Sequence, residues 1–225
     1  MPSSLDRPIW MALTTRQTEF AQTAGAVRRF HPDVGPFAAS AEGTTESLAA
    51  LAELVPEGET VVLQQQSAIS PPPGFIVRRV TATVQMVAHR IEGPSAPLPF
   101  EELTDNDNSD ALALANLTRP GPFAERTRQL GRFVGIRNRG KLVAMAGERF
   151  KLPQFTEVSG VCTHPDYRGK GYAAGLIREV ARTILSRGET PFLHAFADNA
   201  AAIELYRRLG FTTRWEPVLM VLERI

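Results

Sequence analysis

Hydrophobic residues recur at helical spacing between residues 171 and 187. One face carries Ala173, Ile177, Val180, Ala181 and Ile184, and the opposite side carries Arg178, Arg182 and Ser186. This period predicts an amphipathic helix with a buried apolar face. Gly188 follows directly, where a left-handed residue commonly ends a helix. A second helix is predicted over residues 199–209, closed by Gly210.

The rest of the C-terminal half alternates between strand and helix patterns. Asn138-Arg139-Gly140 separates two β-rich runs, a turn composition that predicts a hairpin. Strands are predicted over residues 132–137, 142–150, 155–163 and 191–197 and in one or two runs at the end of the sequence, and short helices over 109–117 and 123–130. This order predicts an α/β (α+β) domain with a mixed sheet flanked by helices.

The N-terminal half has its own pattern and a clear boundary. Gly93-Pro94-Ser95-Ala96-Pro97-Leu98-Pro99 contains three prolines and continues neither a helix nor a central strand. We therefore predict two domains, residues 1–95 and 96–225. The first is a smaller α/β unit with a predicted helix over 48–55, capped at Thr45-Glu46-Ser47. Two strands are predicted over 60–63 and 75–87, separated by the proline-rich segment 70–74, which interrupts regular structure.

Composition excludes several classes of protein. The chain has 225 residues, of which 43% are hydrophobic and 22% charged, and Lys plus Arg exceed Asp plus Glu by 25 to 24. A balanced charge gives no reason to expect nucleic acid or an anionic membrane as partner. No apolar run approaches the roughly 18 residues of a membrane helix, and the first residues do not resemble a signal peptide. We expect a cytoplasmic protein.

Metal and disulfide chemistry are not expected either. Cys162 is the only cysteine, which excludes an intrachain disulfide and a cysteine-cluster zinc site. The four histidines, His31, His89, His164 and His194, show no metal-ligand spacing and are interpreted as structural or exposed. A lone cysteine in a strand is typically a small core residue.

The most informative segment joins the strand over 155–163 to the helix that follows. Pro165 ends the strand, and Arg168-Gly169-Lys170-Gly171 leads into the helix N-terminus. The first N–H groups of a helix lack internal acceptors, and the helix dipole is positive there. Glycine allows close approach of the backbone to an anion. Together with two basic side chains, this segment predicts a pyrophosphate site.

Other interpretations of this loop fit less well. A P-loop requires Ser or Thr after Lys170, where Gly171 stands, and no glycine lies five places before Gly169. Gly169, Gly171 and Ala174 formally match a dinucleotide fingerprint, but five residues separate it from the strand, and it appears near the end of the chain. A capped helix that binds no ligand is the remaining alternative.

Two blocks resemble the GNAT superfamily of N-acetyltransferases. The pattern Arg168-x-x-Gly171-x-Ala173 is similar to its acyl-CoA pyrophosphate loop, and residues 198–211, with Asn199, Tyr206 and Gly210-Phe211, are similar to its late helix. The resemblance covers about residues 98–225. With Cys162-Thr163-His164-Pro165 before the loop, the similarity is fullest to the branch containing glycine N-acyltransferase-like enzymes. It implies a mostly antiparallel GNAT-like sheet and acetyl-CoA as co-substrate. From the α/β pattern of residues 1–95 we expect a degenerate copy of the fold that shapes the acceptor cleft, and because that copy has no second glycine-rich loop we expect one CoA per chain.

The strand before the loop predicts how the thioester arm is held. Val158 and Val161 share a face only if a β-bulge lies at Ser159-Gly160. The bulge would leave backbone N–H groups near Val161 and Thr163 unpaired, and these would bind the pantetheine arm as an added strand. One of them would also donate to the oxyanion that forms when an amine attacks the thioester carbonyl. The alternative is a plain bulged strand. Cofactor-binding residues are predicted to be Val161, Cys162, Thr163, Arg168, Gly169, Lys170, Gly171, Tyr172, Ala173, Ala174 and Asn199.

Two residues are candidates for proton transfer. Glu157, before the bulge, is a candidate base for the attacking amine, with a rim salt bridge as the alternative. Tyr206 is a candidate acid for the departing thiolate, because a phenol is close to a thiol in acidity; the alternative is a packed aromatic. The resemblance favours the catalytic role for Tyr206 and adds a pantetheine contact to the N-cap role of Asn199.

These features together predict an acyltransferase. We expect transfer of an acetyl or other short acyl group from acyl-CoA to a primary amine by direct attack in a ternary complex. A non-catalytic acyl-CoA sensor or scaffold is the alternative, and a dinucleotide-binding oxidoreductase is a more distant one. The acceptor, a small-molecule or peptide amine, is not determined by the sequence, and a monomer and a homodimer both fit.

Overall fold

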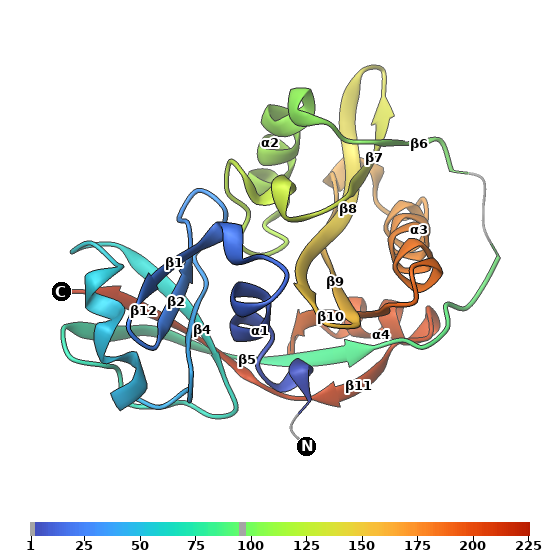
Figure 1. Ribbon diagram of the computed structural model, residues 1–225. Coiled ribbons are helices and arrows are strands. Elements are labelled where there is room, and N and C mark those ends of the chain that lie inside the picture. Colours follow the sequence, from blue (N-terminus) through green and yellow to red (C-terminus); the bar gives the residue numbers. More distant parts are fainter. Residues whose placement is uncertain (1–2, 95–97) are drawn as a thin grey trace.

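The computed structural model describes residues 3–94 and 98–225 and is drawn in Figure 1. The α-helices are α1 (Pro8–Thr14), α2 (Asn108–Thr118), α3 (Tyr172–Ser186) and α4 (Ala200–Arg208). The strands are β1 (Ala21–Ala24), β2 (Val27–Phe30), β3 (Ala38–Ser40), β4 (Thr60–Gln65), β5 (Phe75–Val87), β6 (Phe100–Glu102), β7 (Phe133–Asn138), β8 (Lys141–Leu152), β9 (Phe155–Thr163), β10 (Thr190–Phe196), β11 (Thr212–Trp215) and β12 (Val218–Arg224). Short 3₁₀ segments connect several of them.

A mixed, mostly antiparallel sheet is the centre of the fold, as predicted. Within the described residues it has nine strands in the order β4-β12-β5-β10-β9-β8-β7-β6, with β11 also paired to β5. In that part of the chain the β9–β10 pair is parallel, and the other strand pairs of this sheet are antiparallel. Strands β1, β2 and β3 form a separate antiparallel sheet.

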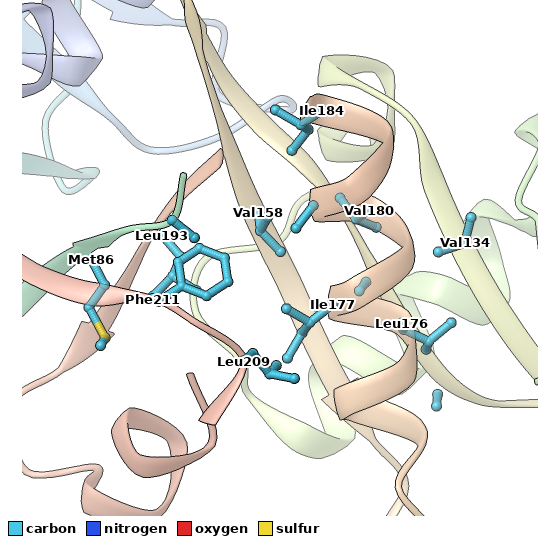
Figure 2. Packing of buried hydrophobic residues seen from close by; sticks show 14 of the residues in the cluster. Met86, Val134, Val158, Leu176, Ile177, Val180, Ile184, Leu193, Leu209 and Phe211 are labelled. Atoms are coloured by element: carbon cyan, nitrogen blue, oxygen red, sulfur yellow. The ribbon is translucent and has the colours of Figure 1, made fainter. Parts of the chain in front are cut away.

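Helix α3 covers one face of the central sheet. Its buried side chains are Leu176, Ile177, Val180, Ala181 and Ile184, which matches the predicted apolar face except that Leu176 is buried and Ala173 only partly so. Figure 2 shows Ile177 and Val180 close to Val158 of β9, with Leu193 and Phe211 beside them. Burying an Ile or Val side chain contributes roughly 1.5–3 kcal/mol. Gly188 ends the helix with φ +76°, so this prediction is confirmed.

Helix α2 covers the opposite face of the same strands (Figure 1). Its Ala111, Leu114 and Ala115 pack with Leu142 and Met145 of β8. The hairpin β7–β8 turns at Arg139-Gly140, both with positive φ, as the turn composition predicts. Two helices therefore enclose the strands that lead to the glycine-rich loop and fix where that loop begins.

Strands from both halves of the chain share the central sheet. β5 lies between β12 and β10, and β4 pairs with β12 at the end of the sheet. The C-terminal strand is therefore inserted between two strands of the N-terminal half. The predicted boundary at residues 95–96 lies outside the described residues, and the division into two domains stays a prediction.

Two predicted helices differ from the structure. The segment predicted over 48–55 is a 3₁₀ helix, Glu46–Glu53, and Thr45 makes no side-chain cap. Instead the hydroxyl of Thr44 accepts from the Ser47 N–H at 3.2 Å, one position earlier than predicted. The segment predicted over 123–130 contains only the 3₁₀ turn Thr127–Leu130. Across the described ranges, no helix combines the length and apolar character needed to cross a membrane.

Candidate active site

Strands β9 and β10 separate beside a β-bulge. Within the described residues their parallel pairing is short: it begins where Phe155 lies opposite Thr190 and ends where Glu157 lies opposite Phe192. Further along β9, the register with β8 shifts between the Gly147–Ser159 and Met145–Cys162 pairs, which places an extra residue on β9. Gly160 there has φ +63°, a conformation that favours glycine. The predicted bulge at Ser159-Gly160 is confirmed.

The separation leaves one edge of β9 facing a gap. The His164 N–H donates to the Val143 carbonyl at 2.8 Å, on the β8 side. Because alternate residues of a strand direct their N–H groups to opposite neighbours, the Thr163 N–H points away from β8. This is the side on which β10 has already diverged, so the geometry offers the edge expected for binding an extended chain.

A cavity of about 770 Å³ occupies this gap. Its lining contains every residue predicted to bind the cofactor, and also Tyr206. It continues past His194 to side chains of the N-terminal half, among them Phe37 and Gln64. The structure thus brings the predicted binding residues together at one cavity, while their binding roles stay predictions.

The glycine-rich loop leaves room for an anion at the start of α3. Gly169 and Gly171 have φ +78° and +76°, and a Cβ added to either would meet nothing within 4 Å. No side chain caps the helix N-terminus, so its first N–H groups remain available. Arg168 reaches back to the Thr163 carbonyl, and the Lys170 amine lies 5.0 Å from the centre of the Tyr167 ring. The open backbone and the nearby cations fit a pyrophosphate.

The late helix contributes Asn199 and Tyr206 to the cavity. Asn199 caps α4 by accepting from the Ala202 N–H at 3.2 Å, so the predicted N-cap is confirmed. Tyr206 packs against Phe211, and burial raises the pKa of its phenol to about 12. No hydrogen bond of the phenol is found among the described residues. A protonated, unpaired hydroxyl therefore lies at the cavity wall.

Glu157 lies beneath the cavity and is not part of its lining. Its carboxylate is fully buried and accepts two hydrogen bonds from the Arg149 guanidinium, at 2.7 and 2.8 Å. Although burial opposes the charged form, Arg149 and His194 together lower the pKa of Glu157 to about 2. A carboxylate held charged in this way is a weak base, so the geometry favours a different role for Glu157 from the one predicted.

His194 connects Glu157 with the cavity. Its Nδ1 lies 2.7 Å from the Glu157 carboxylate, which places a proton on Nδ1 and leaves the lone pair on Nε2. Nε2 then accepts from the side-chain amides of Gln64 and Gln85, at 2.8 and 3.1 Å. The sequence interpretation left His194 as structural or exposed, because the histidines show no metal-ligand spacing. No local pattern relates His194 to a carboxylate 37 positions earlier.

Cys162 is no nucleophile here. It is buried among Leu114, Met145 and other apolar residues beneath α2. Burial raises the pKa of its thiol to about 11, so the thiol stays protonated. Its place in the core agrees with the sequence interpretation. In the ranges that the structure describes, no cluster of three or more His, Cys, Asp or Glu side chains is arranged to hold a metal ion.

Fold and site together define a mixed α/β protein with one cavity between an open helix N-terminus and a free strand edge, and comparison with known proteins identifies its family. A family model described as FR47-like protein matches residues 133–220. A crystal structure titled as a GNAT-family acetyltransferase, from Novosphingobium aromaticivorans, is 42% identical, covers all of both chains and has a TM-score of 0.91. The chain belongs to the GNAT family of acetyltransferases.

Two further relatives extend the comparison. The N-alpha-acetyltransferase RimI of Mycobacterium tuberculosis is 36% identical over 99 residues, which are 41% of this chain and 61% of that protein. The chain thus spans about three fifths of the length of that relative. A GCN5-related N-acetyltransferase from Kribbella flavida is 20% identical, covers 91% of this chain and 88% of its own, and has a TM-score of 0.59, a likeness of fold alone.

Proposed function

We propose that this protein is an N-acetyltransferase that moves an acetyl group from acetyl-CoA to a primary amine by direct attack in a ternary complex. One observation carries the proposal. A single cavity joins the open helix N-terminus at Gly171, the free edge of β9, the Tyr206 hydroxyl and the His194 imidazole. These are the groups needed to bind a pyrophosphate, hold an extended thioester arm and move two protons.

The loop and the β9 edge bind the donor substrate. Acetyl-CoA supplies the acetyl group as a thioester. The N–H groups at the start of α3 and the Arg168 and Lys170 side chains bind the pyrophosphate. The backbone of Val161 and Thr163 binds the pantetheine arm, and an N–H of this edge stabilises charge on the carbonyl oxygen during attack.

His194 accepts the proton of the attacking amine at Nε2. The Glu157 carboxylate holds Nδ1–H at 2.7 Å, and the incoming amine takes the place of the Gln64 and Gln85 amides, which lie 2.8 and 3.1 Å from Nε2 in its absence. As the proton arrives, the same carboxylate stabilises the imidazolium across this hydrogen bond. Glu157 is then a positioning residue and His194 the base, which changes the role predicted for Glu157.

Tyr206 donates the second proton. The C–S bond breaks as the new amide C–N bond forms, and the sulfur takes the phenolic proton. A pKa raised to about 12 keeps this hydroxyl protonated at neutral pH. The phenolate formed in this step is reprotonated from solvent through the cavity before the next turnover.

The acceptor is a primary amine that reaches His194 from the N-terminal half. Phe37, Gln64 and Leu219 line that part of the cavity. The Mycobacterium relative is an N-alpha-acetyltransferase by name, which supports an amine acceptor. The proposal includes a closer relation to the branch containing glycine N-acyltransferase-like enzymes, supported by a resemblance that includes Cys162-Thr163-His164-Pro165.

Thiol release in an acceptor screen tests the activity. With acetyl-CoA and a panel of amino acids, small amines and peptides, we expect free CoA to appear with at least one amine. Tyr206→Phe is expected to lower kcat by about 10²–10⁴-fold while CoA binds as tightly in calorimetry. The wild-type protein binding acetyl-CoA without thiol release from any amine would identify a sensor instead of an enzyme.

A further inference from the structure

A fully buried glutamine lies beside the proposed base. Gln85 of β5 is directly opposite His194 of β10 in the register of these two strands. Its side-chain nitrogen lies 3.1 Å from His194 Nε2. Opposite residues on one face of an antiparallel pair are close enough for their side chains to bond, so the sheet itself maintains this contact.

The orientation of the Gln85 amide is fixed by its other two partners. Its nitrogen donates to the Leu5 carbonyl at 2.8 Å, and its oxygen accepts from the Arg214 guanidinium at 3.0 Å. A backbone carbonyl can only accept and a guanidinium can only donate, so an amide turned the other way would lose both bonds. The Gln85 amide therefore presents an N–H to His194 and can only donate to it.

The N-terminal turn holds both of these partners. Leu5 is buried in a short 3₁₀ turn, which Ser3 and Asp6 close with a capping box. The Asp6 carboxylate also pairs with the Arg214 guanidinium. Both ends of the Gln85 amide are thus connected to the same turn of the N-terminal half, which leaves the amide little freedom to rotate.

The second amide at His194 Nε2 is held less firmly. The side-chain nitrogen of Gln64 lies 2.8 Å from Nε2, and among the described residues the Gln64 side chain makes no other hydrogen bond. Neutral imidazole has a single lone pair on this nitrogen, which two donors must share. Gln64 can therefore turn away when an amine arrives, whereas Gln85 stays beside the ring.

Different groups face the two nitrogens of the ring. At Nδ1 lies the Glu157 carboxylate of β9, which Arg149 of β8 holds in place. At Nε2 lie the two neutral amides, with Arg214 of β11 bonded to Gln85 and Asp6 bonded in turn to Arg214. An acceptor at Nδ1 and a fixed donor at Nε2 favour the same form of the ring, with its proton on Nδ1.

We propose that Gln85 is a positioning residue that keeps the His194 ring singly protonated, with its lone pair on Nε2, between turnovers. This inference rests on the proposed function. A proton on Nε2 would point at the N–H of Gln85, so this donor opposes the doubly protonated ring. During attack the amine proton passes to Nε2, and it then leaves to water in the cavity, which restores the lone pair. Glu157 stabilises the imidazolium, and Gln85 promotes its return to the neutral form.

Gln85→Glu tests this role, because it keeps the size of the side chain and replaces the donor by a carboxylate oxygen. Two carboxylates would then face the ring and hold a proton on each nitrogen. In the thiol assay, we expect the midpoint of the acid side of the kcat/KM pH profile to rise by about one unit or more. At neutral pH, kcat/KM would then fall by about tenfold or more. A lower kcat/KM with the midpoint unchanged would overturn the role.

Gln17→Glu is the matched control. Gln17 is almost as deeply buried, and its amide bonds to the backbone of Leu130, Arg149 and Lys151 at 3.2, 2.8 and 3.1 Å. No histidine is among its hydrogen-bond partners in the described part of the chain. A carboxylate there is buried in a similar way, but we expect the midpoint of the pH profile to stay at the wild-type value.

Nitrogen NMR of isotope-labelled histidine rings gives a second readout that needs no acceptor. His194→Asn assigns the His194 signals among those of the four histidines. At neutral pH we expect a neutral ring with its proton on Nδ1 in the wild type and in Gln17→Glu, and a doubly protonated ring in Gln85→Glu. A His194 ring with the same signals in the wild type and Gln85→Glu would overturn the role.

Gln85→Met decides the question if Gln85→Glu does not fold. Methionine removes the donor without adding a charge, so the doubly protonated ring loses its opponent but gains no second carboxylate. We expect the His194 ring to take up its second proton at a higher pH than in the wild type, in the NMR titration and in the kcat/KM profile alike. An NMR titration that matches the wild type would overturn the role.

The outcomes separate this inference from the proposed function. Normal thiol release, with the NMR signals and the pH profile unchanged in the Gln85 variants, would overturn the positioning role and leave the acetyltransferase proposal standing. If no amine releases thiol, the acetyltransferase proposal fails, and the NMR signals alone then decide whether Gln85 controls the protonation of His194.

Discussion

Removing the buried charge of Glu157 provides the sharpest test of the proposed site. Glu157→Gln keeps the size of the side chain and leaves the Arg149 guanidinium, only 12% exposed, without its anion. Breaking a buried ion pair by removing one partner costs about 3–5 kcal/mol. The pKa of about 2 in the folded protein, against an ordinary 4.5, corresponds independently to roughly 3 kcal/mol of folding free energy. The two values agree.

Urea denaturation of the wild type and the variant measures this loss. We expect the free energy of unfolding to fall by about 3 kcal/mol with an unchanged m-value, and the midpoint temperature to fall by about 6–12 °C. The matched control is Glu204→Gln, which removes an exposed carboxylate 3.3 Å from Arg208 and is expected to change stability by less than about 0.5 kcal/mol. A loss below about 1 kcal/mol for Glu157→Gln would refute the reasoning.

The same variant reports on the active site. A glutamine amide that donates to His194 Nδ1 would force the ring proton onto Nε2 and remove the lone pair that receives the substrate proton. We therefore expect kcat of the variant to fall by about 10²–10⁴-fold while its CoA affinity is retained. The assay is run at a temperature below the denaturation midpoint of the variant, where it is folded. An unchanged kcat would show that His194 does not accept the proton through Nε2.

Three further predictions follow from burial and ionisation. The pKa of Glu157 is lower in the folded protein than in the unfolded chain, so its contribution to the free energy of unfolding is complete above pH 4.5 and is lost as the pH falls towards 2. Acid denaturation of the wild type should show this loss of stability, and Glu157→Gln should lack it. Ile177→Ala, in the core under α3, should lower the free energy of unfolding by about 2–5 kcal/mol in urea, and a loss under 1 kcal/mol would contradict the packing. The Cys162 thiol, with a pKa raised to about 11, should react with a disulfide reagent at pH 8 only as the protein unfolds, and rapid labelling of the native protein would contradict its burial.

The parts of the site that depend on adjacent residues were predictable. The bulge at Ser159-Gly160 follows from an odd spacing of two valines, and the loop at Gly171 follows from glycine and charge at a helix start. Asn199 is recognisable as an N-cap because capping acts over three residues. Each of these features is decided within one turn of helix or a few residues of strand.

The pairing of charges was not predictable in the same way. Glu157 was a candidate base because it precedes the bulge, yet its carboxylate is fully buried beneath two side chains of the neighbouring strands that line the cavity. There Arg149 of β8 and His194 of β10 surround it. Which side chains meet across neighbouring strands depends on strand order and register, and no local pattern specifies these.

The sequence by itself determined the apolar face of α3, the hairpin β7–β8, the bulge in β9 and the helix N-terminus at Gly171, because each depends on periodicity or on the backbone freedom of glycine over a short stretch. The tertiary structure alone decided that β12 lies between β4 and β5, that His194 reaches Glu157, and that Gln64 of β4 reaches His194 of β10. These contacts join residues far apart in the chain. They depend on how the sheet is assembled as a whole, which is a global balance of packing and strand pairing.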